Sequence, residues 1–459
     1  MIAQNTDRTG DSLKERRIGI YDRLKRIPCA VRRRARAGAI HEKSGLGICL
    51  LLGRCAIVVV TLLLAAVQVA TAADSLDSGR GAQASKAVRN ADTAVRRVEE
   101  LAARVVDEAG VTGIGLAIVH DGVVLSERGF GVTDVSTKEA VDADTVFRLA
   151  SLSKTFASAL AAQLIDDGAL RWESRIADQL PALKLHDIQA AQQLSVLDIL
   201  SHRVGLPYNT YDRDLEANQP YPLLVAKLGD APATCQPGDC YAYQNIAFSL
   251  IGDMVFAVTG DFYSHQVERR LFHPLGMYSA TYGRDALEAS VRWARPHIRS
   301  RGRWQAVRPK ETYYRIPPAA GVNASARDMS QWLLAQLGDR PDVLSAAQLK
   351  TMHTGQVDTP GEIRGAGWRG ERVRDAQYGI GWRVFDYAGQ PLIFHAGAVQ
   401  GYRAMMALLP DQNFGIVLMW NCESGAPSGL LATALDDMLA LPSRDWTGLE
   451  RVPKRRNRR

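Results

Sequence analysis

The sequence predicts an α/β protein of the α+β kind, in which an antiparallel sheet is built from both ends of one domain, residues 85–443. Near the start of this domain, an Asp-Gly turn at 121–122 separates two apolar runs, which indicates a β-hairpin. Near its end, four further runs have strand character: 378–387, 392–395, 403–409 and 414–420. Between about 150 and 345 the pattern is mostly helical and is broken by Pro/Gly loops. A helical insert between the two halves of a sheet follows from this order.

Two helices flank the predicted sheet. The first spans 85–109, where apolar residues recur at helical spacing: Val88, Ala91, Val95, Val98, Ala102 and Val105. The second spans 430–441, after a hairpin whose turn is 410–413. Residues 74–84 are small and polar and have the composition of a linker, and 444–459 form a basic tail.

An apolar segment precedes the linker. Residues 55–73 contain 19 amino acids without a charge, long enough to cross a bilayer. The basic flank at 1–54 would keep the N-terminus in the cytoplasm, while Ala70-Thr71-Ala72 fits a signal-peptidase site. The segment is therefore either a transmembrane anchor or a cleaved signal peptide. Both alternatives export the rest of the chain to the periplasm or another extracytoplasmic space.

The net charge of +7 does not indicate a nucleic-acid partner. Residues 1–54 hold 13 Lys/Arg and 451–459 hold another 6, which leaves 37 basic against 44 acidic residues in between. Because this body is mildly acidic, no basic binding face is expected. The expected partners are the membrane, through 55–73, and a small-molecule or peptide substrate.

Cysteine usage agrees with export. Cys235 and Cys240 bracket the turn-forming Gln-Pro-Gly-Asp, so a short loop disulfide is favoured over two free thiols. No metal site is expected, because two cysteines without a nearby histidine pair do not make a zinc ligand set. No cofactor is expected either.

The chemistry is predicted to begin at Ser151. Ser151 and Lys154 stand at i and i+3 at the start of a helical run, so their side chains share one face. Unpaired backbone N–H groups surround a hydroxyl at a helix start. A lysine in an apolar pocket has a lowered pKa and can activate a serine. The alternative is an ordinary helix cap with a surface lysine, but the apolar flanks on both sides favour burial of the pair.

Two later triplets complete the pattern. Tyr243-Gln244-Asn245 precedes a buried helical run, 246–258, and His395-Ala396-Gly397 ends a short apolar strand. Alone, the first is more typical of a loop end and the second of an ordinary edge-strand histidine.

In this order the three motifs resemble the signature of serine β-lactamases and penicillin-binding proteins: Ser-x-x-Lys, Tyr-x-Asn and Lys/His-x-Gly. The sequence is most similar to class C β-lactamases and their relatives, the D,D-carboxypeptidases, D-aminopeptidases and esterases. Further stretches with this likeness are 200–207, 272–277, 321–328 and 415–418. The resemblance implies the β-lactamase/transpeptidase-like fold.

The resemblance also implies roles. Ser151 would attack a carbonyl and form an acyl-enzyme, with Lys154 and Tyr243 sharing proton transfer and Tyr243 as the favoured base. Asn245 would bind the substrate amide. The backbone N–H groups of Ser151 and Ala398, beside Gly397, would form an oxyanion hole, in which each donor is worth roughly 3 kcal/mol.

The third triplet departs from the class C pattern of Lys-Thr-Gly. His395 is only partly charged near neutral pH, and Ala396 has no hydroxyl for a substrate carboxylate. Arg403, on the next strand, is a candidate for the missing cation, with a surface arginine as the alternative. The donor therefore stays open between a β-lactam, a D-alanyl peptide, a D-amino amide and an ester.

Two other classes of function are disfavoured. The sequence contains no Gly-x-Ser-x-Gly pentapeptide for an α/β-hydrolase and no His-Glu-x-x-His for a metallohydrolase. A penicillin sensor without turnover would be expected to lack Ser151, Lys154 or Tyr243, and all three are present.

Overall fold

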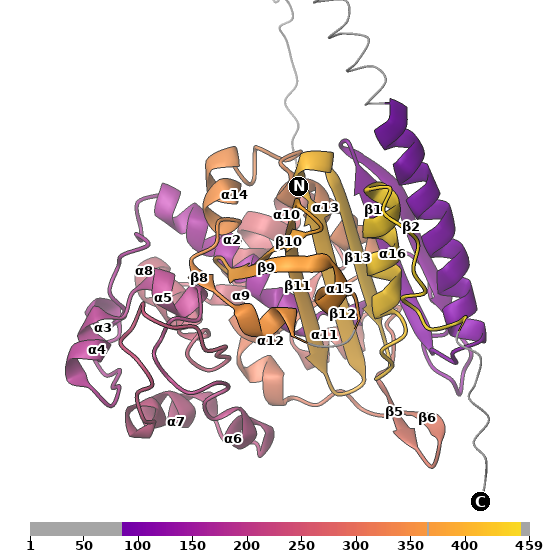
Figure 1. The fold of residues 1–459 in the computed structure, drawn as a ribbon. Coiled ribbons are helices and arrows are strands. Elements are labelled where there is room, and N and C mark those ends of the chain that lie inside the picture. Colours follow the sequence, from indigo (N-terminus) through magenta and orange to yellow (C-terminus); the bar gives the residue numbers. More distant parts are fainter. Residues whose placement is uncertain (1–84, 365–366, 451–459) are drawn as a thin grey trace, which may run out of the picture. The chain divides into compact units, whose positions relative to one another are not determined.

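A computed structural model describes residues 85–364 and 367–450 (Figure 1). Its centre is an eight-stranded sheet of order β2-β1-β13-β12-β11-β10-β9-β8. Every neighbouring pair in this sheet is antiparallel. The strands are β1 (Gly113–His120), β2 (Val123–Gly131), β8 (Val357–Asp358), β9 (Val373–Tyr378), β10 (Arg383–Tyr387), β11 (Gln390–Val399), β12 (Tyr402–Leu409) and β13 (Phe414–Trp420). The predicted antiparallel sheet from both ends of the domain is confirmed.

The sheet is buried on both faces. Successive side chains of a strand point to opposite sides, and here both sets pack into hydrophobic clusters. In β13, Val417 and Met419 pack into one hydrophobic cluster, whereas Ile416, Leu418 and Trp420 pack into the other. The first cluster joins the sheet to α2 (Ser153–Asp166), α13 (Ala326–Leu337) and the helical insert. The second lies under a helix over 85–107 and under α16 (Ser428–Met438).

The helical insert carries short elements between long loops (Figure 1). Its helices are α3 (Ile176–Gln179), α4 (Ile188–Gln193), α5 (Val196–Leu200), α6 (Asp212–Glu216), α7 (Tyr221–Ala226), α8 (Leu250–Thr259), α9 (Tyr263–Val267), α10 (His273–Leu275), α11 (Arg284–Ala289) and α12 (Pro317–Ala320). Later helices are α14 (Ala346–Met352) and α15 (Trp368–Arg372). Short strands β3 (Phe147–Arg148), β7 (Val322–Ala324) and β4 (Thr281–Tyr282) form a second sheet, and β5 (His297–Ser300) pairs with β6 (Arg303–Ala306).

Several predicted boundaries are wrong. The single strand expected at 378–387 is two strands, because residues 379–382 turn the chain between β9 and β10. Gly381 has a φ of +74°, in the left-handed region that glycine adopts without a Cβ clash. The predicted tail also begins too early, since Trp446 packs on the second cluster and its indole N–H donates to Asp436 at 2.9 Å.

The predicted apolar segment at 55–73, its basic flank at 1–54 and the linker at 74–84 lie outside the described residues. Within the described ranges, no helix is both long and apolar enough to cross a membrane.

Candidate active site

Ser151 lies in a tight turn between β3 and α2. A 3₁₀ turn, Ala150–Leu152, leads directly into α2, so the serine stands at the helix start. Ala150 has a φ of +50°, an unfavourable conformation for a residue with a Cβ. The Ser153 hydroxyl holds this turn by donating to the Ala150 carbonyl at 2.6 Å and accepting from the Val322 N–H at 2.9 Å.

Lys154 is fully buried one turn further along. Its Nζ donates to the Asn245 side-chain oxygen at 2.7 Å and to the Ala319 carbonyl at 3.1 Å, and lies 3.5 Å from Ser151 Oγ. Burial lowers the pKa of Lys154 well below its ordinary value of 10.5. Asp212 opposes this effect on the pKa, while Arg383 strengthens it. The lowered pKa makes Lys154 a better proton acceptor for the serine hydroxyl than an exposed lysine would be.

Tyr243 covers the lysine from the insert. Lys154 Nζ lies 4.7 Å from the centre of the tyrosine ring. Burial raises the pKa of Tyr243, and the nearby Arg383 guanidinium only partly offsets it. The tyrosine is therefore a neutral donor in the resting site. Lys154 and Tyr243 thus both lie beside Ser151, and the expected role of Tyr243 as the base stays a prediction.

Asn245 connects the lysine to an acidic residue, Asp212, that no sequence motif marks. The Asn245 amide N–H donates to Asp212 at 2.7 Å while its oxygen accepts from Lys154. Burial raises the pKa of Asp212, and the bond from Asn245 lowers it in part.

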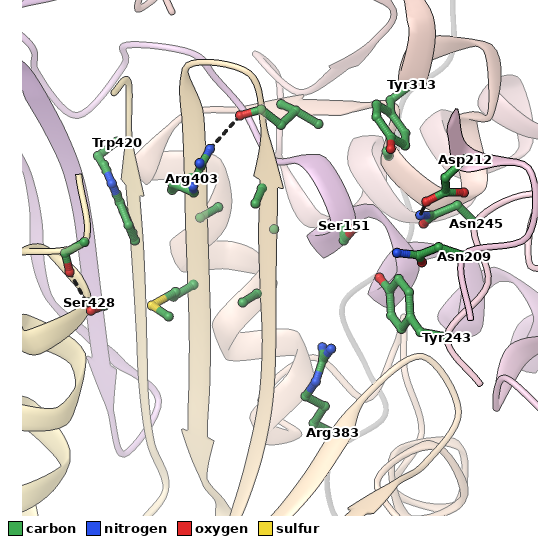
Figure 2. A pocket seen from close by; sticks show the side chains of 18 of the residues that line it. Ser151, Asn209, Asp212, Tyr243, Asn245, Tyr313, Arg383, Arg403, Trp420 and Ser428 are labelled. Carbon is green, nitrogen blue, oxygen red and sulfur yellow. Dashed lines mark hydrogen bonds between the residues drawn. The ribbon is translucent and has the colours of Figure 1, made fainter. Parts of the chain in front are cut away.

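These groups meet in one cavity of about 480 Å³. Figure 2 shows Ser151 between the strands that carry Arg403 and Trp420 and the insert segments that carry Tyr243, Asn245 and Asp212. Predicted site residues on its wall are Ser151, Tyr243, Asn245, Gly397, Ala398 and Arg403. Further lining residues include Tyr208, Asn209, Asp212, Tyr313 and Arg383.

Gly397 brings strand β11 against the serine turn. A Cβ at this position would lie 2.2 Å from the Leu149 carbonyl oxygen and 2.9 Å from the Ser151 nitrogen, so only glycine fits without a shift. Ala398 follows on the cavity wall. The strand and the turn thus face the cavity together, the arrangement an oxyanion hole requires.

His395 is placed differently from the expectation. It is fully buried and is not part of the cavity wall. Its Nδ1 lies 2.9 Å from the Ala396 carbonyl and its Nε2 lies 3.2 Å from the Tyr378 hydroxyl. Burial, together with Arg383 and Lys154, lowers the pKa of His395 well below 6.5. A neutral, enclosed histidine supplies no positive charge to a substrate.

Arg383, instead of His395, supplies a positive charge to the cavity wall. It begins β10 and lines the cavity, with its Cζ 5.5 Å from the centre of the Tyr243 ring (Figure 2). No local signal marks it in the sequence, because its position depends on the turn at 379–382. Arg403, the predicted cation, also lines the cavity, but its Nη1 donates to the Val399 and Tyr402 carbonyls at 2.6 and 2.7 Å.

Cys235 and Cys240 form a disulfide at the start of the segment that carries Tyr243. The loop is tied to the insert by backbone bonds from Thr234 to Gly205 and from Gly238 to Arg203, both 2.8 Å. Among the described residues no group of His, Cys, Asp or Glu side chains could hold a metal ion.

The arrangement supports acyl transfer. In this arrangement Ser151 Oγ can attack a carbonyl carbon while its proton moves to the Lys154–Tyr243 pair, and the N–H groups of Ser151 and Ala398 are the predicted donors to the oxyanion. The scissile C–N or C–O bond would then break as the leaving group takes a proton from the same pair. Water would attack the acyl-enzyme, release the acid and restore the serine.

The beta-lactamase family model matches residues 98–440. Penicillin-binding protein 4 of Amycolatopsis lactamdurans is 29% identical over 327 residues, which cover 68% of this chain and 82% of that protein. An unguisins hydrolase of Aspergillus violaceofuscus is 24% identical over 372 residues, 73% of this chain and 64% of that protein.

Solved structures share the fold. A penicillin-binding protein homologue from Pyrococcus abyssi, described as octameric, aligns with a TM-score of 0.67 at 22% identity and covers 76% of this chain and 78% of that one. EstCE1, described as a hydrolase with promiscuous acyltransferase activity, aligns at 0.63 and 19% identity, over 76% and 99% of the two chains. With the Ser151 site in place and the family model matched over most of its length, the chain is a serine hydrolase that belongs to the beta-lactamase family.

Proposed function

We propose that the protein is an exported hydrolase that cleaves a D-alanyl-peptide-type amide next to a free carboxylate. The observation that carries this proposal is Arg383, a buried guanidinium on the wall of the cavity that contains Ser151. A guanidinium is the side chain best suited to bind a carboxylate.

The charge around Arg383 leaves a positive surplus. Its Nε lies 3.2 Å from one oxygen of Glu362, while Arg369 donates to the other oxygen at 2.6 Å. Two guanidiniums therefore share one carboxylate, so an incoming anion is favoured. The relative named penicillin-binding protein 4 also supports this substrate class.

The second candidate is a D-aminopeptidase or ester hydrolase. Asp212 favours the first, because a carboxyl group on the cavity wall is suited to a substrate amine. The neighbour described as a hydrolase with promiscuous acyltransferase activity favours acyl transfer without a carboxylate requirement.

One comparison separates these substrates. Wild type and Ser151→Ala should be assayed on a D-Ala-D-Ala peptide, nitrocefin, D-alanine amide and p-nitrophenyl butyrate. Ser151-dependent cleavage of the peptide is expected, and Arg383→Gln should raise KM for the carboxylate substrates but not for the ester. Turnover of the amide or the ester alone would contradict the proposed peptide substrate and support the second candidate, a D-aminopeptidase or ester hydrolase. A stable adduct with fluorescent penicillin and no turnover would indicate a sensor.

Export is part of the proposal and rests on the apolar segment at 55–73 and on the disulfide. Protease added to intact spheroplasts that express the full chain should degrade the hydrolase domain. Leu63→Arg, which places a charge inside the apolar segment, should leave the domain protected. Equal protection of both proteins would contradict export.

A further inference from the structure

A buried chain of hydrogen bonds runs behind the active site and connects its two halves. The Gln244 N–H donates to His202 Nδ1 at 3.2 Å. His202 Nε2 lies 3.1 Å from the Tyr378 hydroxyl, which lies 3.2 Å from His395 Nε2. His395 Nδ1 then reaches the Ala396 carbonyl at 2.9 Å. Both histidines and Tyr378 are fully buried.

The ends of this chain determine the direction of every bond. A backbone N–H can only donate, so His202 Nδ1 accepts and a neutral His202 must carry its proton on Nε2. A carbonyl can only accept, so His395 carries its proton on Nδ1. Tyr378 therefore accepts from His202 and donates to His395. Arg383 Nη1, 3.4 Å from His395 Nε2, agrees because it too can only donate.

We propose that His202, Tyr378 and His395 are positioning residues. Together they form one neutral hydrogen-bond chain that fixes the position of the Tyr243–Asn245 segment relative to β11 at Gly397 and Ala398. The two segments come from the insert and from the sheet, and Ser151 acts between them. His202 also lies against the Tyr243 ring, with 4.2 Å between ring centres. This inference rests on acyl transfer at Ser151 and not on the identity of the substrate.

Protonation of either histidine breaks the chain, because an imidazolium has two donors and cannot accept. Burial is the main cause that disfavours this charge, and it lowers the pKa of both histidines well below 6.5. Nearby basic groups lower the pKa further: Lys154, Arg383 and His395 for His202, and Arg383, Lys154 and Arg369 for His395. Tyr241, Tyr243 and Tyr378 are the titratable side chains that lie against the two rings.

The tautomers can be measured without any substrate. In full-length protein with ¹⁵N-labelled histidine, NMR at pH 7 should show two neutral rings of opposite tautomer, Nε2–H for His202 and Nδ1–H for His395. Tyr378→Phe should shift these two signals, which assigns them. Tyr387→Phe is the matched control, since Tyr387 is a buried tyrosine on β10 whose hydroxyl lies 2.7 Å from Asp436. A charged His395, or two identical tautomers, would overturn the proposal.

Kinetics test the positioning role. Tyr378→Phe should lower kcat for p-nitrophenyl butyrate, or the rate of Ser151 acylation by fluorescent penicillin, by about tenfold to a hundredfold with little change in KM. The acid limb of the pH profile should move to higher pH, because the hydroxyl no longer donates to neutral His395. Tyr387→Phe should leave both readouts unchanged. If Tyr378→Phe lowers only the melting temperature, the chain is structural and the proposal fails.

Discussion

At the scale of single residues, Gly397 is where the sheet and the nucleophile turn come closest. Gly397→Ala places a Cβ against the Leu149 carbonyl and the Ser151 nitrogen, both backbone atoms that cannot rotate away. We expect kcat to fall about a hundredfold, because the oxyanion donors are displaced from the carbonyl. The measurement is ester hydrolysis by protein whose circular dichroism matches wild type.

Gly425 offers the matched control. It lines the same cavity, yet a Cβ built on it meets no atom within 4 Å. Gly425→Ala should therefore keep kcat within about twofold of wild type. Equal losses in both variants would show that the cavity as a whole, and not the approach of β11 to Ser151, is sensitive to an added methyl group.

Lys154 gives a prediction for the pH dependence of stability. Its pKa is lowered by burial in the folded protein and lies near 10.5 in the unfolded chain. Between these values the unfolded chain binds the extra proton, so the free energy of unfolding rises with pH and the cost of burying the lysine disappears above 10.5. Lys154→Met lacks this contribution. Urea denaturation at pH 7 and pH 10 should show wild type gaining stability relative to Lys154→Met as the pH rises; a constant difference would mean that the lysine is buried charged.

Residue spacing predicted which side chains approach Ser151 but not all their roles. Lys154 was predictable because i and i+3 share a helix face, and Tyr243 and Asn245 came from the order of motifs. Arg383 and Asp212 were not, since nothing local distinguishes them from surface charges. The sequence predicts that His395 binds the substrate. The hydrogen-bond partners of its two nitrogens cannot be read from a sequence, and they hold a neutral His395 behind the cavity wall.

At the scale of elements, the disulfide loop determines how the segment with Tyr243 leaves the insert. The Cys235–Cys240 disulfide closes a six-residue loop that ends three positions before Tyr243. In the chain-entropy model this closure contributes about 2 kcal/mol. The Cys235→Ser/Cys240→Ser double variant should therefore melt at lower temperature and lose part of kcat as Tyr243 gains freedom.

Reductant supplies the control for this prediction. Dithiothreitol should lower the melting temperature and kcat of wild type toward those of the double variant and leave the double variant unchanged. An effect on both proteins would trace to other groups, since the chain has six cysteines and Cys422 is free and buried.

Element types were more predictable than element boundaries. The Asp-Gly hairpin and the last strand agree with the structure because their apolar runs end at turn residues. By contrast, the run 378–387 is rich in aromatic and apolar residues but contains the end of β9, a turn and β10. In the turn at 379–382, Gly381 is left-handed and packs against the Lys154 carbonyl, and Arg383 follows directly on the cavity wall.

At the scale of the whole domain, the order of strands and helices was enough to predict a sheet with an insert, because the apolar runs at the two ends have no other partner. The packing of the insert was not predictable, since its short helices are joined by loops whose contacts are not local. The two faces of the sheet have separate roles. One face packs against α2 and the insert, which carry the site, and the other face packs against the first helix and α16.

This separation predicts that stability can be lost on the far face without loss of catalysis. Val98, on the helix over 85–107, is fully buried in the second cluster, whereas Val88 on the same helix is 49% exposed. Val98→Ala should lower the free energy of unfolding by about 2 kcal/mol through the cavity it leaves, and Val88→Ala should change it by less than about 0.5 kcal/mol. Urea denaturation measures both. Because the sheet lies between Val98 and Ser151, active-site titration should give the same kcat per folded molecule for both variants; a lower kcat for Val98→Ala would show that the two faces are mechanically coupled.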